Sequence, residues 1–375
     1  MDKLTIISKF RVIGCLLLVV VISPHLARAS GDRGLEAHLA AAVEGLRNFG
    51  GGISRGTQLL NAGFLNVSLD TERAGWWPGG TAFLEGVINH GQDPSARFIG
   101  DVQVASNIAD RNRTNLHQAW YAQNLGDHAS VLAGLHDLNT VFDFSDYASI
   151  FLNSSFGIGP EISVNVPASI WPRAGGAVVA QGHWGRLSAR VGVYDGDPLT
   201  RAIRPGAEGL MWIGEASWAD GARAYKIGAW RHTADKTGPD GRVFGSDSGA
   251  YVIVDQPLYE KDGTALGVFL QLGAAQSDRN DIASYVGAGL HLDGPFPGRR
   301  QDSFGVALAR AGFSSVARRI NGWTRDETAI EVTYDMALTE WLHLHPSFQY
   351  IRHPGGDPRL SAAKVGMLRV RVDWP

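Results

Sequence analysis

Apolar and polar residues alternate without exception along the stretch LRVRVDW, residues 368–374, close to the end of the chain. In an extended strand, successive side chains point to opposite faces. One face of this segment therefore carries leucine, valine and tryptophan, and the other carries Arg369, Arg371 and Asp373. A strand with one apolar and one charged face predicts a sheet that separates an apolar environment from water.

The same alternation recurs from residue 35 onward. It is clearest at residues 58–70, 187–193 and 330–336, where apolar and polar positions again take turns. The complete pattern predicts sixteen strands, at residues 35–47, 57–71, 80–90, 115–125, 129–138, 176–183, 187–195, 209–218, 223–233, 249–258, 265–275, 283–292, 302–312, 327–338, 341–351 and 362–374.

The connectors between these segments indicate what kind of sheet they form. Compact turns such as 126–128 and 220–221 alternate with longer links such as 91–114 and 139–175. Short periplasmic turns, long external loops, an even number of strands and aromatic girdles are typical of outer-membrane barrels. Aromatic residues near the predicted segment ends fit such girdles: Trp76, Trp77, Trp184, Trp218, Trp230, Trp341, Tyr350 and Trp374.

The sequence therefore predicts an all-β protein, a sixteen-stranded antiparallel transmembrane β-barrel of the outer-membrane porin type. Residues 98–108 also alternate, but a seventeenth strand would break the parity, so we place them in a loop. The link 139–175 is rich in apolar and aromatic residues, which predicts that it folds into the barrel lumen. A secreted soluble β protein, such as a lectin or adhesin, is the competing hypothesis, and it would extract without detergent.

The N-terminus has the features of an export signal. A basic start at residues 3–11 precedes an apolar run at 12–22, and Ala27 and Ala29 provide the small residues of a cleavage site before Ser30. The apolar run is shorter than the ~20 residues that a membrane-spanning helix needs. We therefore predict a signal peptide at residues 1–29 and a single barrel domain at residues 30–375, located in the outer membrane of a Gram-negative bacterium.

Composition argues against several other functions. The net charge of −3 gives no basic patch for nucleic acid. The single cysteine, Cys15, falls in the predicted signal peptide, so the exported chain has no thiol chemistry. His343 and His345 share a strand face without an evident third metal ligand, and we expect no enzyme activity, metal or cofactor.

Five stretches carry a family resemblance. The first, AGWWPGGT at residues 74–81, resembles the Gly-Trp-Trp-Pro-Gly-Gly turn of the carbohydrate-selective porins of the OprB family. Four others resemble the same family and occur in its order, at residues 100–108, 147–157, 193–198 and 349–356. The resemblance extends over residues 50–375 and implies a sixteen-stranded barrel, passive diffusion of glucose and related sugars, and a constriction lined by inward loops and charged side chains.

The chain departs from the family pattern at its end and in its lumen. Such barrels usually end on an aromatic residue that the barrel-assembly machinery reads, whereas here Pro375 follows Trp374. Leu132 and Gln271 occupy places where relatives often carry an inward basic residue. The first difference bears on assembly, and the second bears on the substrate more than on the fold. A general, non-selective porin is the alternative function.

The alternation also assigns candidates for the sugar path. Charged and amide side chains can replace the hydrogen bonds that a sugar loses with water, and mixed signs keep the path polar without selecting one ion. The inward candidates are Glu85, Asn89, Gln118, Trp120, Arg190, Glu215, Lys226, Asp255, Gln271, Glu331, Arg369 and Arg371, and the loop candidates are Arg97, Asp101, Asn107, Arg111 and Arg113. From these we predict a constriction formed by Arg190, Glu215, Arg369, Arg371, Glu85, Gln118, Trp120, Glu331, Arg111 and Arg113.

The expected partners follow from this assignment. They are mono- or oligosaccharides, outer-membrane lipids and the barrel-assembly machinery. The outward faces are mostly apolar, which suits either lipid or a second subunit, so a lone barrel and a homo-oligomer both stay open.

Overall fold

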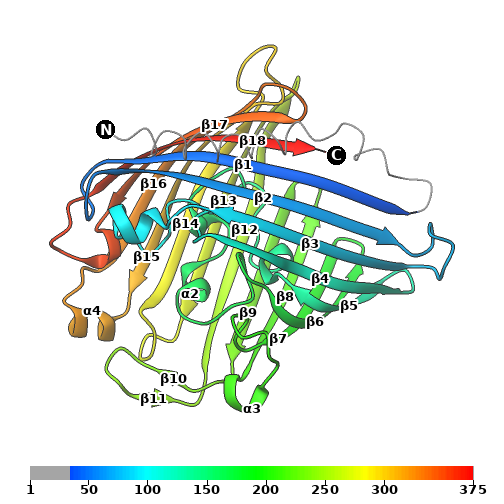
Figure 1. Cartoon of the computed structure of the whole chain (residues 1–375), viewed down its shortest axis with the longest axis horizontal. Coiled ribbons are helices and arrows are strands. Elements are labelled where there is room, and N and C mark those ends of the chain that lie inside the picture. The colour runs from blue at the N-terminus through cyan, green and yellow to red at the C-terminus, as the bar shows by residue number, and fades with distance from the viewer. Residues whose placement is uncertain (1–33, 375) are drawn as a thin grey trace, which may run out of the picture.

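The computed structural model describes residues 34–374 and shows a closed barrel of sixteen antiparallel strands (Figure 1). Each barrel strand pairs with the next one, and β1 pairs with β18 to close the ring. The strands are β1 (Leu35–Gly50), β2 (Gly56–Asp70), β3 (Gly80–His90), β4 (Arg113–Leu125), β5 (Ala129–His136), β6 (Gly175–Trp184), β7 (Leu187–Asp195), β8 (Leu210–Asp220), β9 (Arg223–His232), β12 (Asp247–Lys261), β13 (Thr264–Ala275), β14 (Ile282–Asp293), β15 (Ser303–Phe313), β16 (Asp326–Ala337), β17 (Leu342–Arg352) and β18 (Ala363–Trp374). All sixteen predicted strands are confirmed, with ends shifted by a few residues. The predicted signal peptide lies outside the described residues.

Short elements occupy the long links. They are the strands β10 (Lys236–Thr237) and β11 (Val243–Phe244), which pair with each other, and the helices α2 (Pro160–Ser163), α3 (Pro205–Glu208) and α4 (Ser315–Asn321). Figure 1 places α3, α4 and the β10–β11 pair at the same end of the barrel, and α2 inside the ring of strands. Within residues 34–374, no helix has both the length and the apolar character needed to cross a membrane. Residues 98–108 begin in a helical turn at Ser95–Ile99 and form no strand, as predicted.

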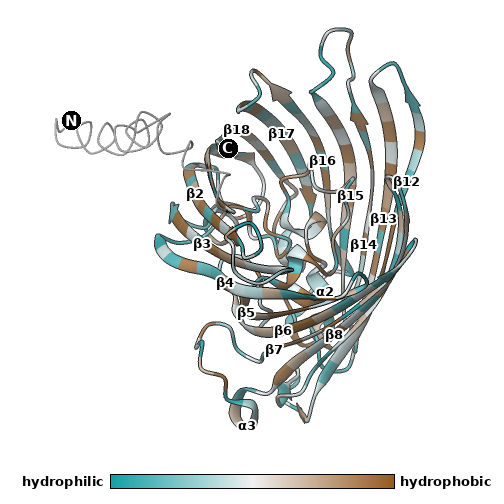
Figure 2. Cartoon of the chain, turned by 90° about the vertical axis from the view of Figure 1, so that its right-hand side faces the viewer, coloured by the Kyte–Doolittle hydropathy of each residue, from teal (hydrophilic) through white to brown (hydrophobic). Residues whose placement is uncertain are grey.

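The predicted alternation of faces is confirmed. On β18, Leu368 is 48% exposed on the outer surface, whereas Arg369 beside it is 7% exposed and points into the barrel. Figure 2 shows the same change between hydrophobic and hydrophilic positions along β13, β14 and β15. The outward, mostly apolar side chains therefore face the lipid, and the inward side chains, such as Arg369, face the lumen.

One predicted girdle residue was placed wrongly. Trp230 is only 2% exposed and points inward, where its indole lies over Gly249 of the neighbouring strand. A β-carbon at position 249 would come within 2.6 Å of that ring, so the contact depends on glycine. By contrast, Trp184 is 60% exposed at its periplasmic turn, as a girdle residue should be.

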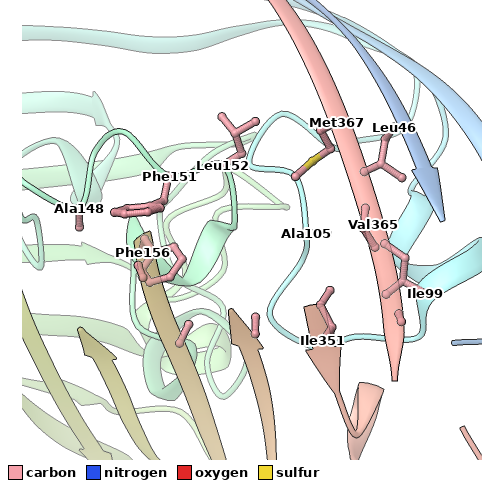
Figure 3. Packing of buried hydrophobic residues seen from close by; sticks show 14 of the residues in the cluster. Leu46, Ile99, Ala105, Ala148, Phe151, Leu152, Phe156, Ile351, Val365 and Met367 are labelled. Carbon is pink, nitrogen blue, oxygen red and sulfur yellow. The ribbon is translucent and has the colours of Figure 1, made fainter. Parts of the chain in front are cut away.

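Two of the long links, residues 91–112 and 137–174, fold inward and build a hydrophobic core inside the barrel (Figure 3). Phe151 and Phe156 of the second link pack in one cluster with Met367 on β18. Phe151 also lies over Gly305 of β15, where a β-carbon would meet its ring at 2.6 Å. Each such buried side chain contributes roughly 1.5–3 kcal/mol. The prediction that the link 139–175 enters the lumen is confirmed.

Candidate functional site

A cavity of about 600 Å³ lies in the lumen, between the wall strands β1, β2 and β18 and the two inward links. Its lining combines polar side chains with aromatic and aliphatic ones. The polar residues include Gln103, Asn107, Asp137, Asn139, Arg369 and Arg371, and the apolar residues include Phe64, Ile108, Ile158, Ile170, Trp171 and Pro172.

Arg369 is held in this cavity by partners on two different segments. The barrel register places it opposite Glu44 of β1, and its guanidinium nitrogen Nη2 lies 2.7 Å from the Glu44 carboxylate. The side chains of Arg369 and Glu44 are 8% and 0% exposed. Arg369 also donates a 2.8 Å hydrogen bond to the side-chain oxygen of Asn107. One arginine thus connects the wall to the first inward link.

Arg371 lies two residues further along the same face of β18 and is more open to solvent, with 37% of its side chain exposed. It forms ion pairs with Asp373 at 2.6 Å and with Asp335 at 3.3 Å. Its charge is therefore shared among carboxylates while part of its side chain reaches the cavity.

An aromatic pair lines the same cavity. The ring centroids of Trp171 and Phe64 are 5.1 Å apart, and His117 packs edge-on against Trp171 at 5.5 Å. Our sequence prediction missed this pair. Trp171 lies in an irregular link where no periodicity marks its direction, and its only signal is a tryptophan next to a proline.

Two predicted path residues hold the second inward link against the wall. Glu331 of β16 is fully buried and accepts hydrogen bonds from the amides of Leu152 at 2.9 Å and Asn153 at 3.0 Å. Glu215 of β8 accepts one from the amide of Asp143 at 3.2 Å. Both carboxylates point inward as predicted, but the link covers them and they do not line the cavity.

Three further predicted path residues lie on the wall strands β3 and β4, beside the start of the second inward link. Gln118 accepts a hydrogen bond from the amide of Asp137 at 3.1 Å and donates one to Glu85 at 3.2 Å. Trp120 stacks on Phe83, with ring centroids 4.9 Å apart. None of Gln118, Glu85 and Trp120 lines the cavity.

The remaining predicted residues are arginines away from the cavity. Arg190 donates a hydrogen bond to the carbonyl of Val141 and lies 3.5 Å from Glu215. Arg113 forms a salt bridge at 2.9 Å with the aspartate three residues before it, and Arg111 is exposed on the link before β4. Within the described part of the chain, the structure therefore brings only Arg369 and Arg371 of the predicted set to the cavity lining.

The first inward link is held in the same way by a residue that sequence reasoning missed. Glu327 of β16 is fully buried and accepts hydrogen bonds from the amides of Val102 at 2.9 Å, Gln103 at 3.0 Å and Gly355 at 2.6 Å. Its inward position could be deduced from the alternation, but its contacts could not. Wall carboxylates that accept link amides are thus the common device that positions both links.

Asp143, in the second inward link, makes the stability of this assembly depend on pH. Burial raises the pKa of its carboxyl from the ordinary value of 3.8 to about 7. The charged form is therefore disfavoured in the folded protein, and the stability that protonation provides is lost as the pH rises from about 4 to about 7.

We expect Asp143→Asn to remove this loss. Asparagine keeps an oxygen that can accept the 2.8 Å hydrogen bond from the amide of Gly159, and it tolerates the positive φ of 51° at this position. The thermal midpoint of the variant should exceed that of the wild type by at least about 2 °C at pH 8 and match it at pH 4. Asp146→Asn, an exposed change in the same link, is the control. A variant with no advantage at pH 8 would contradict the prediction.

The family model described as "Carbohydrate-selective porin, OprB family" matches residues 55–374 of the chain. The chain belongs to the OprB family. Among its relatives, Porin B of Pseudomonas aeruginosa is 24% identical over 334 residues, which cover 75% of this chain and 72% of that protein.

Solved porin structures share the fold of this OprB-family chain. The high-pH structure of Pseudomonas putida OprB matches with a TM-score of 0.82 at 20% identity, covering 92% of this chain and 95% of that one. The low-pH structure of the same protein matches with a TM-score of 0.58 at 17% identity, covering 92% and 93%. Salmonella typhi OmpF matches with a TM-score of 0.62 at 9% identity, covering 92% and 99%.

The OprB-family chain is therefore a carbohydrate-selective porin of the Gram-negative outer membrane, a channel and not an enzyme. Its predicted fold and its predicted function as a carbohydrate-selective porin are confirmed, and the non-selective alternative is not supported. No group of three or more histidine, cysteine or acidic residues that could hold a metal occurs in residues 34–374. His343 instead lies 3.1 Å from Asp335, and His345 lies 2.7 Å from Thr333.

Proposed function

We propose that the cavity beside Arg369, Arg371 and Trp171 is the sugar-selecting constriction, and that it passes neutral monosaccharides of the glucose type by passive diffusion. The observation that carries this proposal is that an aromatic pair and two arginines line one cavity. The apolar face of a sugar ring can stack on an indole, and its hydroxyls can accept charge-assisted hydrogen bonds from guanidinium groups. A volume of about 600 Å³ falls within the ~300–1,000 Å³ typical of small-molecule sites.

The electrostatics of the cavity support a neutral solute. Arg369 is paired with Glu44, and Arg371 is paired with Asp335 and Asp373. Because opposite charges are held side by side, the path offers polar contacts without a ring of one sign that would select ions. Weak, mixed contacts also allow the sugar to leave, which conduction requires.

Single-channel recording and liposome swelling test the substrate. Glucose should block the current through the reconstituted porin, and an amino acid of similar size should not. Swelling rates with sugars of graded size should fall steeply beyond monosaccharides. A current that glucose leaves unblocked would overturn the proposal.

Removing the indole of Trp171 from the aromatic pair should weaken sugar binding. We expect Trp171→Ala to raise the glucose concentration that half-blocks the current by about tenfold, because a stacking contact contributes roughly 0.5–1.5 kcal/mol beyond its buried area. Trp184→Ala, which removes a tryptophan that is 60% exposed on the lipid-facing surface, should leave this concentration unchanged. Equal block of the wild type and Trp171→Ala would exclude Trp171 from the sugar path.

The proposal extends to export and assembly. Residues 1–29 are removed during export, which sequencing of the mature N-terminus would test. Insertion of the chain by the barrel-assembly machinery is part of the same proposal. The outward apolar faces suit either lipid or a second copy of the chain, and native electrophoresis of the detergent extract distinguishes the two.

A further inference from the structure

Basic side chains gather on the outer surface of the barrel at the ends of β15–β18 and β1 that meet the long links. Four exposed residues form this basic sector: Arg310 of β15, Arg352 of β17, Lys364 of β18 and Arg47 of β1. Their outward direction follows from their neighbours. Lys364, for example, lies between Ala363 and Val365, both 0% exposed inside the barrel. Long links of outer-membrane barrels lie on the extracellular side, so the sector faces the outer leaflet.

The barrel register makes these side chains neighbours. Arg310 and Arg352 both pair with Thr328, from opposite sides of β16, so they lie in one row. Two strand spacings put them roughly 10 Å apart. Lys364 pairs with Tyr350 and lies diagonally from Arg352, and it has the same diagonal relation to Arg47 across β18 and β1. Diagonal cross-strand neighbours are about 7–8 Å apart, within reach of one large anionic ligand.

The positive charge of the sector is largely uncompensated. Arg310 is paired with Asp326 at 2.8 Å, and the nearby Asp357 is already paired with Arg359 at 2.6 Å. Within residues 34–374, Arg47, Arg352 and Lys364 form no salt bridge. The helix α4, which connects β15 to β16, adds two more basic residues, Arg318 and Arg319.

The sector is local and is not a property of the whole rim. In the register row that contains Arg310 and Arg352, the next strands β14, β13 and β12 present the apolar residues Val286, Leu272 and Val252. Towards the middle of the membrane, the surface of the basic sector becomes apolar. The outward residues there are Leu308, Ile330, Phe348 and Leu368, which are 36–48% exposed. The surface thus combines unpaired cations at the headgroup level with a continuous apolar strip below them.

We propose that the basic sector binds the phosphate groups of a phosphorylated, multiply acylated glycolipid of the outer leaflet, whose acyl chains lie along the apolar strip. Guanidinium groups form paired hydrogen bonds with phosphate oxygens. Basic residues beside an apolar belt attract anionic lipid headgroups. The position of the sector, continuous with the lipid-facing surface, favours a lipid over a soluble anion.

Native mass spectrometry of the detergent-solubilised porin tests this surface. Diphosphoryl lipid A should bind to the wild type, and Arg47→Gln/Arg352→Gln/Lys364→Gln should weaken this binding by about 100-fold, because each basic residue near an anionic lipid surface contributes roughly fivefold. Arg231→Gln is the matched control, since Arg231 is an exposed, outward residue at the extracellular end of β9, outside the sector. Equal lipid A binding by the triple variant and the wild type would overturn the proposal.

Further arms, on the wild type and on the triple variant, identify the occupant. Dephosphorylated lipid A should bind much more weakly than the diphosphoryl form, and inorganic phosphate should not compete with the latter. If phosphate competes at the same concentration, the site is one for free anions. If the triple variant loses dimers instead of lipid adducts, the surface is a contact between two copies of the chain. Either result would overturn the lipid assignment, whereas glucose block should be unchanged throughout because the sector lies outside the lumen.

Discussion

Glu331→Ala should release the second inward link and remove most of the selectivity for sugar. The Glu331 carboxylate is fully buried and accepts hydrogen bonds from the amides of Leu152 and Asn153, the hydroxyl of Ser347 and the side chain of Gln349. Without it, two buried amides lose their acceptor at a cost of about 1–3 kcal/mol each. Since these amides belong to the segment that packs in the lumen, we expect the segment to leave the wall.

Two measurements test the prediction for Glu331→Ala. Heating in SDS followed by electrophoresis should show a lower unfolding temperature for Glu331→Ala. Single-channel recording should show a higher conductance and a glucose block weakened by about tenfold or more, which corresponds to about 1.4 kcal/mol. Glu331→Gln keeps one acceptor oxygen and should give an intermediate result. Glu340→Ala, an exposed change in a periplasmic turn, should match the wild type. An unchanged conductance in Glu331→Ala would show that the segment is held without this carboxylate.

Arg369→Ala should have a comparable effect on stability and a larger one on sugar binding. It leaves Glu44, whose side chain is 0% exposed, as an unpaired charge in the barrel wall. Breaking a buried ion pair by removing one partner costs about 3–5 kcal/mol. It also removes the 2.8 Å hydrogen bond to Asn107, which orders the first inward link beside the cavity.

A double change separates the two roles of Arg369. Glu44→Gln/Arg369→Gln removes both charges, so most of the stability should return, whereas the glucose block should remain weak because the guanidinium is absent. Arg371→Gln, whose side chain is 37% exposed, should cost less than about 1 kcal/mol of stability. Full glucose block in the double variant would show that Arg369 supports the cavity without contacting the sugar.

The strands of this porin could be predicted because their signals are local. Alternation along LRVRVDW at residues 368–374 sets which side chains share a face, and every inward candidate that we named lies on the inner face. Trp230 shows where this signal fails. Neither face of residues 223–233 is uniformly apolar, and the indole turns inward because it fits over Gly249 of the next strand.

The candidate constriction could be predicted only in part. Arg369 and Arg371 line the cavity, but the equally well-marked Glu331 and Glu215 are covered by a link. Trp171 had no periodic pattern to mark it. Likewise, the outward direction of Arg352 and Lys364 follows from the alternation, but closure of the barrel brings Arg47 beside Lys364.

The sequence by itself determined the strand number, the family, and the inner and outer faces of the clearly alternating strands, because successive side chains of a strand point to opposite faces. Only the tertiary structure decided which inward residues meet the lumen and which hold a link. Glu331 binds amides that are 178 and 179 positions away, and Arg369 binds a carboxylate 325 positions away. Contacts at such separations depend on the closed ring and on the path of the links inside it, and neither leaves a periodic mark in the sequence.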